Sequence, residues 1–173
     1  MKLNLGCCNS RIEGYKGVDI NKYPNVDIVS PVDKLSFAVD NSIEEIYASN
    51  ILEHFSHLRT QEVLNEWNRV LKPRGKIFIS VPDIEGIVDF ISKYGYSRWI
   101  EEILYGGHTD KFNRHYAGFT LDKIIRQLEN AGFKDVVRVD TFPHKLRDCS
   151  AIKANDMIEE KGCKVILNVI ARK

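Results

Sequence analysis

The chain has 173 residues, of which 43% are hydrophobic and 28% charged, and its formal net charge is +1. This length suits one domain with a single core, and the composition is typical of a soluble globular protein. The small net charge gives no signature of nucleic-acid or anionic-membrane binding, and no apolar run approaches the roughly 20 residues that span a bilayer. The first residues lack the apolar segment of a signal peptide, and we expect a cytoplasmic protein.

The four cysteines do not form a metal-binding pattern. Cys7 and Cys8 are adjacent, Cys149 and Cys163 lie far along the chain, and no CxxC pair is present. A structural zinc site needs about four well-spaced ligands. We therefore expect free thiols in a reducing compartment and no metal ion.

The first half of the chain alternates strands with turns and one helix. Short apolar segments predict strands over residues 2–5, 17–20, 26–29 and 43–49. Leu64, Trp67 and Val70 recur at helical spacing and predict an amphipathic helix over 58–71. The sequence Lys72-Pro73-Arg74-Gly75 ends this helix, and a β-branched and aromatic run predicts a strand over 76–81.

The second half is less regular. Residues 83–116 predict two helices and a loop that contains Gly106, Gly107 and His108. Thr120 is a candidate N-cap for a helix over 121–130, which Gly132 ends. Strands are predicted over 136–139 and 164–170, with a short helix over 155–160 between them. Strands that alternate with helices favour an α/β fold with a mainly parallel sheet.

Small and polar residues follow three of the predicted strands. Gly6 follows the first strand, Asp19 lies near the end of the second, and Ser49 and Asn50 end the fourth. Ligands of open α/β sheets bind at the carboxyl ends of strands. A glycine allows close approach of a ligand to the backbone, and a carboxylate can accept hydrogen bonds from both hydroxyls of a ribose. We therefore predict a ligand site at this edge of the sheet.

Five segments in order resemble the class I S-adenosylmethionine-dependent methyltransferases. Leu3-Asn4-Leu5-Gly6-Cys7-Cys8 resembles the family's glycine-rich first motif, and Gly17-Val18-Asp19-Ile20 its second. The segment of residues 46–55, which contains Leu52-Glu53-His54, is similar to the sequence after strand four of the family. Arg69-Val70-Leu71-Lys72-Pro73-Arg74-Gly75 resembles the motif before strand five, and Ala131-Gly132-Phe133 the segment before strand six. The resemblance covers roughly residues 2 to 139.

This resemblance implies a Rossmann-like, mainly parallel seven-stranded sheet with helices on both faces and an antiparallel last strand. It implies one domain over residues 1–173, with lid-like insertions at about 83–119 and 143–162. The implied cofactor is S-adenosylmethionine. Its implied contacts are Gly6 and Cys7 at the methionine part, Asp19 at the ribose, Ile20, Val32 and Asp33 at the adenine, and Ser49 and Asn50 at the methyl-donor end.

Three departures from the family pattern stand near this site. Cys8 occupies the place of the second glycine of the first motif, and Pro31 the place of an acidic residue before the adenine loop. Residues 9–16 are too few for the helix that usually follows strand one. These departures motivate an alternative function, a catalytically inactive S-adenosylmethionine-binding module that acts as a regulator or partner subunit.

The loop before residue 120 carries the candidate catalytic residues. His108 and His115 lie close together after the two glycines, and a histidine can accept a proton near neutral pH. We name His115 first and His108 second as candidates, against the alternative that they only pack the loop on the sheet. A metal site from His108, Asp110 and His115 is conceivable, but we do not predict it. For His54 we expect local packing and capping.

The sequence therefore predicts methyl transfer from S-adenosylmethionine to a small-molecule or sugar-type acceptor, without nucleic-acid or membrane partners. The oligomeric state is not predicted. A nicotinamide dehydrogenase fits less well, because no GxGxxG is present and Asp19 follows Gly6 by only 13 residues, against about 20 in that fingerprint.

Overall fold

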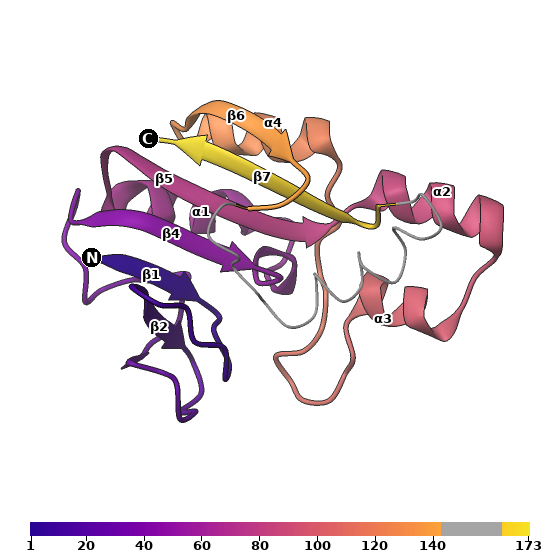
Figure 1. Ribbon diagram of the computed structural model, residues 1–173, viewed down its shortest axis with the longest axis horizontal. Helices are drawn as coiled ribbons and strands as arrows, with labels where there is room; N and C mark the ends of the chain where they lie inside the picture. The colour runs from indigo at the N-terminus through magenta and orange to yellow at the C-terminus, as the bar shows by residue number, and fades with distance from the viewer. Residues whose placement is uncertain (143–163) are drawn as a thin grey trace.

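The computed structural model describes residues 1–142 and 164–173, and these residues contain a seven-stranded sheet. Its strand order is β3-β2-β1-β4-β5-β7-β6 (Figure 1). The strands are β1 (Lys2–Leu5), β2 (Lys16–Asp19), β3 (Ile28–Val29), β4 (Ile43–Ser49), β5 (Leu71–Pro82), β6 (Lys134–Val139) and β7 (Ile166–Arg172).

All neighbouring strands from β3 to β5 are parallel, and β7 runs antiparallel to both β5 and β6. The predicted α/β class and the predicted antiparallel last strand are therefore confirmed. The chain passes from β1 outward to β2 and β3 and then returns to place β4 on the other side of β1. This reversal creates a switch point between β1 and β4, at whose carboxyl ends a crevice is expected.

One face of the sheet is covered by helices α1 (Thr60–Val70) and α4 (Leu121–Asn130), which lie behind it in Figure 1. Val63, Leu64 and Trp67 of α1 are fully buried and belong to one cluster with apolar residues of β1, β4 and β5. Thr120 caps α4, since its hydroxyl accepts a hydrogen bond from the Lys123 N–H at 3.2 Å. The predicted boundaries of α4 are confirmed.

The opposite face carries Tyr47 and Phe78. These side chains pack against Ile12, Tyr15 and Phe142, which lie in connecting segments. Within the described residues no helix follows β1, because only ten residues separate β1 from β2. The expected loss of the first helix is therefore confirmed, and among the described residues side chains of connecting segments pack on this part of the face.

Two further helices, α2 (Ile84–Tyr94) and α3 (Arg98–Tyr105), form an arm beyond the carboxyl ends of β4 and β5 (Figure 1). Ile87, Phe90 and Ile100 hold the arm together and contact Val165 and Ile166 at the start of β7. The arm brings α3 opposite the switch point of the sheet.

Several predicted boundaries differ from the structure. The strand predicted over 26–29 has only two paired residues, Ile28 and Val29. Helix α1 ends at Val70, and β5 begins at once because Leu71 already pairs with Ile43. The predicted insertion at 143–162 and short helix at 155–160 lie outside the described residues. In the described part of the chain, no helix has the length and apolarity to cross a membrane.

Candidate functional site

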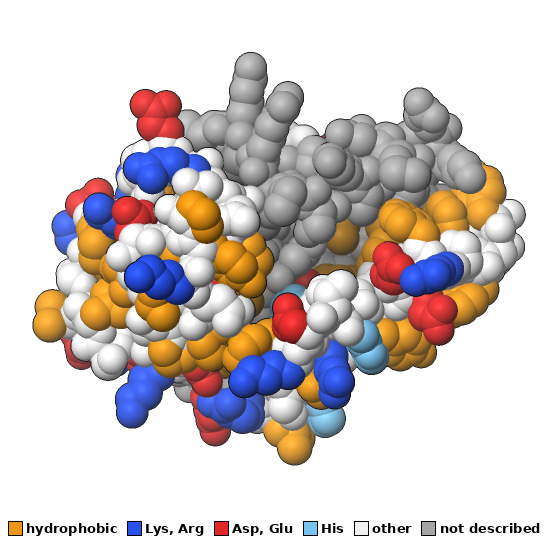
Figure 2. All heavy atoms as spheres, turned by 90° about the horizontal axis from the view of Figure 1, so that it is seen from below, with side chains coloured by type: hydrophobic (Ala, Val, Ile, Leu, Met, Phe, Trp, Pro, Cys, Tyr) orange, Lys and Arg blue, Asp and Glu red, His pale blue; other side chains and the backbone are white. Residues whose placement is uncertain are grey.

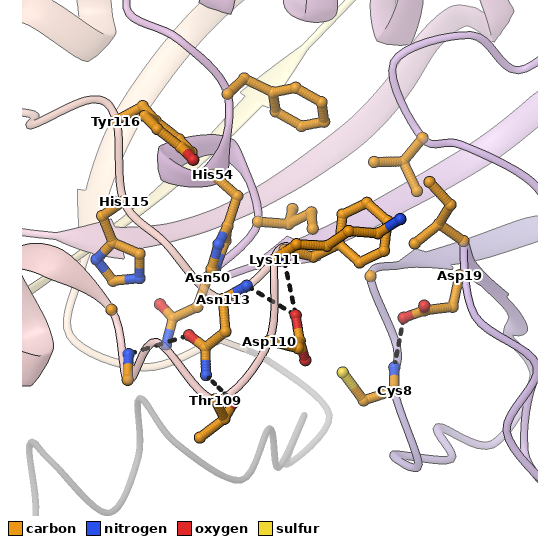
Figure 3. Close-up of a pocket in the computed structure, with 18 of the residues that line it drawn as sticks. Cys8, Asp19, Asn50, His54, Thr109, Asp110, Lys111, Asn113, His115 and Tyr116 are labelled. Atoms are coloured by element: carbon orange, nitrogen blue, oxygen red, sulfur yellow. Dashed lines mark hydrogen bonds between the residues drawn. The ribbon is translucent and has the colours of Figure 1, made fainter.

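A cleft of about 850 Å³ opens at the carboxyl ends of β1, β2 and β4. One half is lined by the ends of these strands, and the other by α3 and the loop of residues 106–116 (Figure 3). In Figure 2 this region shows histidine side chains beside charged and apolar ones, between the body of the protein and the arm. A volume of this size accommodates a nucleoside-sized ligand together with a small second molecule.

The turn after β1 forms the floor of the first half. Gly6 has φ +67°, and its N–H donates to the Val18 carbonyl at 2.8 Å. A Cβ on Gly6 would lie 2.6 Å from Cδ1 of Ile51. A side chain is therefore excluded by both the backbone conformation and the neighbouring Ile51, and the backbone itself lines the cleft.

Asp19 ends β2 and is the acidic group of this half. Its residue is only 5% exposed, yet it lines the cleft. Oδ2 accepts the Cys8 N–H and Oδ1 accepts the Asn21 N–H, each at 2.9 Å. Two backbone bonds fix the carboxylate, and each oxygen retains acceptor capacity for a ligand hydroxyl.

Cys8 lines the cleft, whereas Cys7 does not. Cys7 is 3% exposed and points away from the cleft, toward Gly17. Burial and the nearby Asp19 carboxylate raise the pKa of the Cys7 thiol to about 12. Of the two cysteines, therefore, the side chain that reaches the cleft is that of Cys8, whereas the contact predicted for Cys7 stays a prediction. Cys8 has φ +45°, the left-handed conformation that explains why a glycine is usual at this place in the family.

The loop of residues 31–40 contributes residues 31–33 to the wall where contacts with the adenine are predicted. Val32 and Asp33 both line the cleft, and so does Ile20 at the end of β2. Oδ2 of Asp33 accepts a hydrogen bond from Arg59 at 2.8 Å, so an ion pair holds the side chain of this predicted adenine contact.

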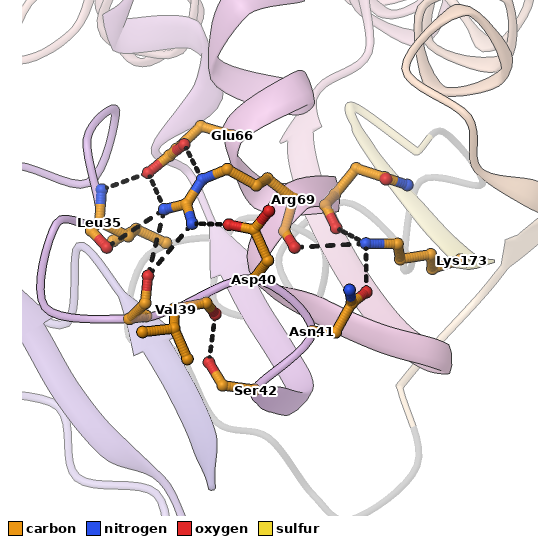
Figure 4. A network of polar contacts seen from close by, with 10 residues as sticks. Leu35, Val39, Asp40, Asn41, Ser42, Glu66, Arg69 and Lys173 are labelled. Carbon is orange, nitrogen blue, oxygen red and sulfur yellow. Dashed lines mark hydrogen bonds and ion pairs between the residues drawn. The ribbon is translucent and has the colours of Figure 1, made fainter.

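Side chains of helix α1 hold the loop of residues 31–40 in place (Figure 4). Arg69 donates two parallel hydrogen bonds to the Glu66 carboxylate, both at 2.8 Å, and further bonds to the carbonyl of Ala38 and to Asp40. Glu66 also accepts the Leu35 N–H at 2.7 Å. These ion pairs raise the pKa of Arg69 further above its ordinary value. Arg69 therefore positions the loop, a role that the sequence analysis did not assign to it.

The end of β4 places Asn50 in the cleft and Ser49 beneath it. Asn50 has φ +48° and its N–H donates to the Ser80 carbonyl at 2.8 Å. Ser49 is buried and is not among the residues that line the cleft. Of the two predicted contacts at the methyl-donor end, only Asn50 therefore reaches the cavity directly.

The second half of the cleft combines apolar and acidic side chains. Trp99, Glu102 and Ile103 of α3 face it, together with Phe112 and Tyr116 of the loop. The loop has internal support, which Figure 3 shows. Asp110 accepts the N–H groups of Phe112 and Asn113, and the Asn113 side chain accepts from Gly107 and donates to Thr109.

His115 and His54 meet in this half of the cleft. Their rings lie edge to face with centroids 4.7 Å apart. Nδ1 of His115 is 2.8 Å from the Ile103 carbonyl, so it carries the proton and leaves Nε2 as the acceptor nitrogen. Burial, with the neighbouring His54, lowers the pKa of His115 to about 4, and burial also lowers the pKa of His54.

The other candidate, His108, does not line the cleft. It is exposed, and its Nε2 lies 3.0 Å from the Tyr105 carbonyl. Sequence reasoning missed His54, Trp99 and Glu102 as cleft residues. For His54 the sequence held a signal, because Leu52-Glu53-His54 follows β4 and β4 ends at the switch point of the sheet. For Trp99 and Glu102 it held none, because the helical pattern of α3 does not indicate that this helix lies across the cleft from the strand ends.

A sheet of this order with a cleft at its switch point defines a Rossmann-like ligand-binding domain. The family model described as a methyltransferase domain matches residues 12–138, and the chain belongs to this family. This match confirms the predicted family of S-adenosylmethionine-dependent methyltransferases and its cofactor. A search of curated proteins finds no match.

Solved structures of the same fold include a S-adenosylmethionine-dependent methyltransferase from Archaeoglobus fulgidus, with 19% identity and a TM-score of 0.61 over 99% of this chain and 85% of that one. The 1,6-didemethyltoxoflavin-N1-methyltransferase of Burkholderia thailandensis, with bound S-adenosylhomocysteine, has 20% identity and a TM-score of 0.63 over 99% and 70%. A putative methyltransferase of Haloferax volcanii, in complex with the activator Trm112, has 15% identity and a TM-score of 0.62 over 99% and 81%. At these identities the likeness concerns the fold.

Proposed function

We propose that this protein transfers the methyl group of S-adenosylmethionine to a hydroxyl or amine of a small-molecule or sugar-type acceptor. The observation that carries the proposal is the division of one cleft into two halves. Asp19 and the Gly6 turn line the first half, and His115 lines the second. The two halves meet beside Asn50, where the methyl donor and the acceptor would come together.

The residues of the first half fit the cofactor. The close backbone at Gly6 leaves room for the methionine part, and the fixed Asp19 carboxylate can accept hydrogen bonds from the ribose hydroxyls. Ile20 and Val32 provide apolar contact for the adenine, with Asp33 at its edge. The cofactor supplies a methyl group already activated on a sulfonium, so the protein contributes mainly orientation and exclusion of water.

The second half suits a small acceptor with both apolar and polar groups. Trp99 and Tyr116 offer ring surfaces, and Glu102 and Asp110 offer acceptors for hydroxyl or amine protons. Because His115 has a pKa of about 4, it is neutral at pH 7. Its Nε2 therefore orients the acceptor group by accepting a hydrogen bond, and it is a weak proton acceptor. We also propose that residues 83–119 act as a lid over this half.

The alternative is a binding module without turnover. The left-handed backbone of Cys8, where the family usually has glycine, is the observation that favours it. Both functions predict cofactor binding, and only the first predicts product. The neutral charge balance supports small-molecule rather than nucleic-acid acceptors, and the cytoplasmic location stays a prediction.

Activity is tested with S-adenosylmethionine labelled in its methyl group and a panel of small alcohols, amines, phenols and sugars. We expect label in at least one acceptor, with loss of most product in a His115→Ala variant that still binds S-adenosylhomocysteine. A chain that binds S-adenosylhomocysteine but labels no acceptor in the panel would favour the binding module instead.

A further inference from the structure

Glu53, His54 and His115 form a cluster at the acceptor half of the cleft. One ligand-type atom of each, a carboxylate oxygen or an imidazole nitrogen, lies within 4.8 Å of the other two. Glu53 and His54 belong to the single-turn helix η1 (Leu52–His54) that follows β4, and His115 comes from the loop after α3. The chain thus brings together two segments that are about sixty residues apart.

The surroundings hold the cluster in place. The Glu53 carbonyl accepts the N–H groups of Tyr116 and Ala117 at 2.8 and 3.2 Å, which ties η1 to the loop beside His115. Glu53 itself is fully buried, so its carboxyl group lies away from bulk water and within 4.8 Å of an imidazole nitrogen of each histidine.

The two imidazoles present nitrogens suited to a metal ion. Nδ1 of His115 faces the Ile103 carbonyl at 2.8 Å, which leaves the Nε2 lone pair unoccupied by a proton. A histidine that binds a metal usually donates its other N–H to a carbonyl or carboxylate in this way. Nδ1 of His54 is buried and has no hydrogen-bond partner within residues 1–142 and 164–173, whereas backbone groups of Asn50, Phe112 and Arg114 interact with the ring.

We propose that Glu53, His54 and His115 bind one divalent transition-metal ion, with its remaining coordination positions open to the cleft. Two imidazoles and one carboxylate form a nitrogen and oxygen donor set, which suits Mn²⁺, Fe²⁺, Co²⁺ or Zn²⁺. Such ligands lie roughly 2.0–2.2 Å from the ion. The present spacing of up to 4.8 Å therefore requires small rotations of the side chains on binding.

The charges nearby are compatible with a cation. Asp110 and Glu102 line the same half of the cleft, and Asp110 is close enough to act electrostatically on His54. Lys111 also lines the cleft, and its ammonium stands 4.8 Å over the Phe112 ring. Glu102 and Asp110 together exceed the positive charge of Lys111.

The inference deepens the proposed function, because it assigns a cation to the acceptor half. A bound ion lowers the pKa of a coordinated hydroxyl, a chemistry that a neutral His115 supplies only weakly. In the metal-bound protein, an acceptor oxygen would therefore meet the ion in place of Nε2 of His115. Metal affinity is measured without cofactor and is therefore independent of the activity assay. The protein can transfer methyl groups without binding a metal ion, and it can bind a metal ion without transferring methyl groups.

The test is titration of the chelator-treated protein with Co²⁺, followed by visible absorption and by calorimetry. We expect one equivalent to bind with new d–d absorption bands that report nitrogen and oxygen ligands. His115→Ala and Glu53→Gln should each weaken binding about tenfold or more. His57→Ala, which removes an exposed histidine outside the cleft, is the matched control and should bind like the parent chain.

Because Glu53 is fully buried, the folding of the Glu53→Gln variant is checked by circular dichroism. If that variant unfolds, the His115→Ala variant provides the decisive comparison, since His115 is partly exposed. The absence of saturable binding up to about 100 µM Co²⁺ and Mn²⁺ would overturn the proposal. Equal affinity in the parent and His115→Ala chains would also overturn it, since the ion would then sit elsewhere.

Discussion

The indole N–H of Trp67 donates a hydrogen bond of 2.8 Å to the backbone carbonyl of Val32. Trp67 is fully buried in α1, and Val32 lines the cofactor half of the cleft. A helix that contributes no side chain to the cleft thereby fixes the wall of the binding site. The segment before β5, which the sequence predicts as core, therefore also holds a loop residue that lines the cleft.

Arg69→Lys tests whether the loop depends on α1. Lysine keeps the charge but cannot reproduce the paired bonds to Glu66, so we expect a loss of about 1 kcal/mol in the free energy of unfolding. The affinity for S-adenosylhomocysteine should fall severalfold because the loop of residues 31–40 loosens. Arg126→Lys, at an exposed ion pair on α4, is the control for both measurements.

If Arg69→Lys and Arg126→Lys behave alike in urea unfolding and in calorimetry, then the Arg69 network does not position the loop. The expected difference is largest for affinity, because Arg126 and its partner Asp122 are remote from the cleft.

Gly6→Ala tests the close approach at the first turn. Both Gly6 and Gly14 have positive φ, at +67° and +81°, so the backbone conformation alone should make alanine cost about 1 kcal/mol of stability at either position. Only the alanine at position 6 would also press on Ile51 in the cleft, since nothing lies within 4 Å of a Cβ at Gly14. We therefore expect weaker S-adenosylhomocysteine binding in Gly6→Ala alone. Equal affinity in the two variants would remove Gly6 from the cofactor site.

Thiol reactivity distinguishes the two adjacent cysteines. With a pKa of about 12, the buried Cys7 has a thiolate fraction of roughly one in ten thousand at pH 8. Cys8 is exposed and lines the cleft. Iodoacetamide at pH 8 should therefore alkylate Cys8 rapidly in the Cys7→Ala variant. In the Cys8→Ala variant, it should alkylate Cys7 only when the protein unfolds.

Peptide mass spectrometry measures both reactions, and S-adenosylhomocysteine should slow the alkylation of Cys8. Rapid labelling of Cys7 in the folded chain would contradict the burial of this side chain. Unchanged labelling of Cys8 at a saturating concentration of S-adenosylhomocysteine would indicate that the cofactor lies elsewhere.

The fold was largely predictable because its signals are local. The strand over residues 2–5, the helix over 121–130 and its Thr120 cap depend on short-range periodicity and capping, and all three are confirmed. The two-residue β3 was overestimated, since pairing with β2 ends where the chain turns away. Coverage of the second sheet face depended on tertiary packing of Ile12 and Phe142, which no periodicity encodes.

The candidate site was predictable where strand ends determine it. Gly6, Asp19 and Asn50 follow strands directly, and the topology brings them to one edge. Which side chain a strand end presents to the cleft depends on the local backbone, and for this reason the cleft is lined by Cys8 and not by Cys7. His54 and His115 lie side by side because the loop of residues 106–116 packs against η1, and this contact cannot be predicted from the spacing of residues in the sequence.

The most direct measurement of the central claim is calorimetric titration of the chain with S-adenosylhomocysteine, together with Asp19→Asn and Asp27→Asn variants. Both carboxylates accept a backbone N–H, but only Asp19 lines the cleft. We predict saturable one-to-one binding well below about 1 mM, weakened roughly tenfold or more in Asp19→Asn and retained in Asp27→Asn. No binding by the parent chain at about 1 mM, or unchanged affinity in Asp19→Asn, would contradict the account.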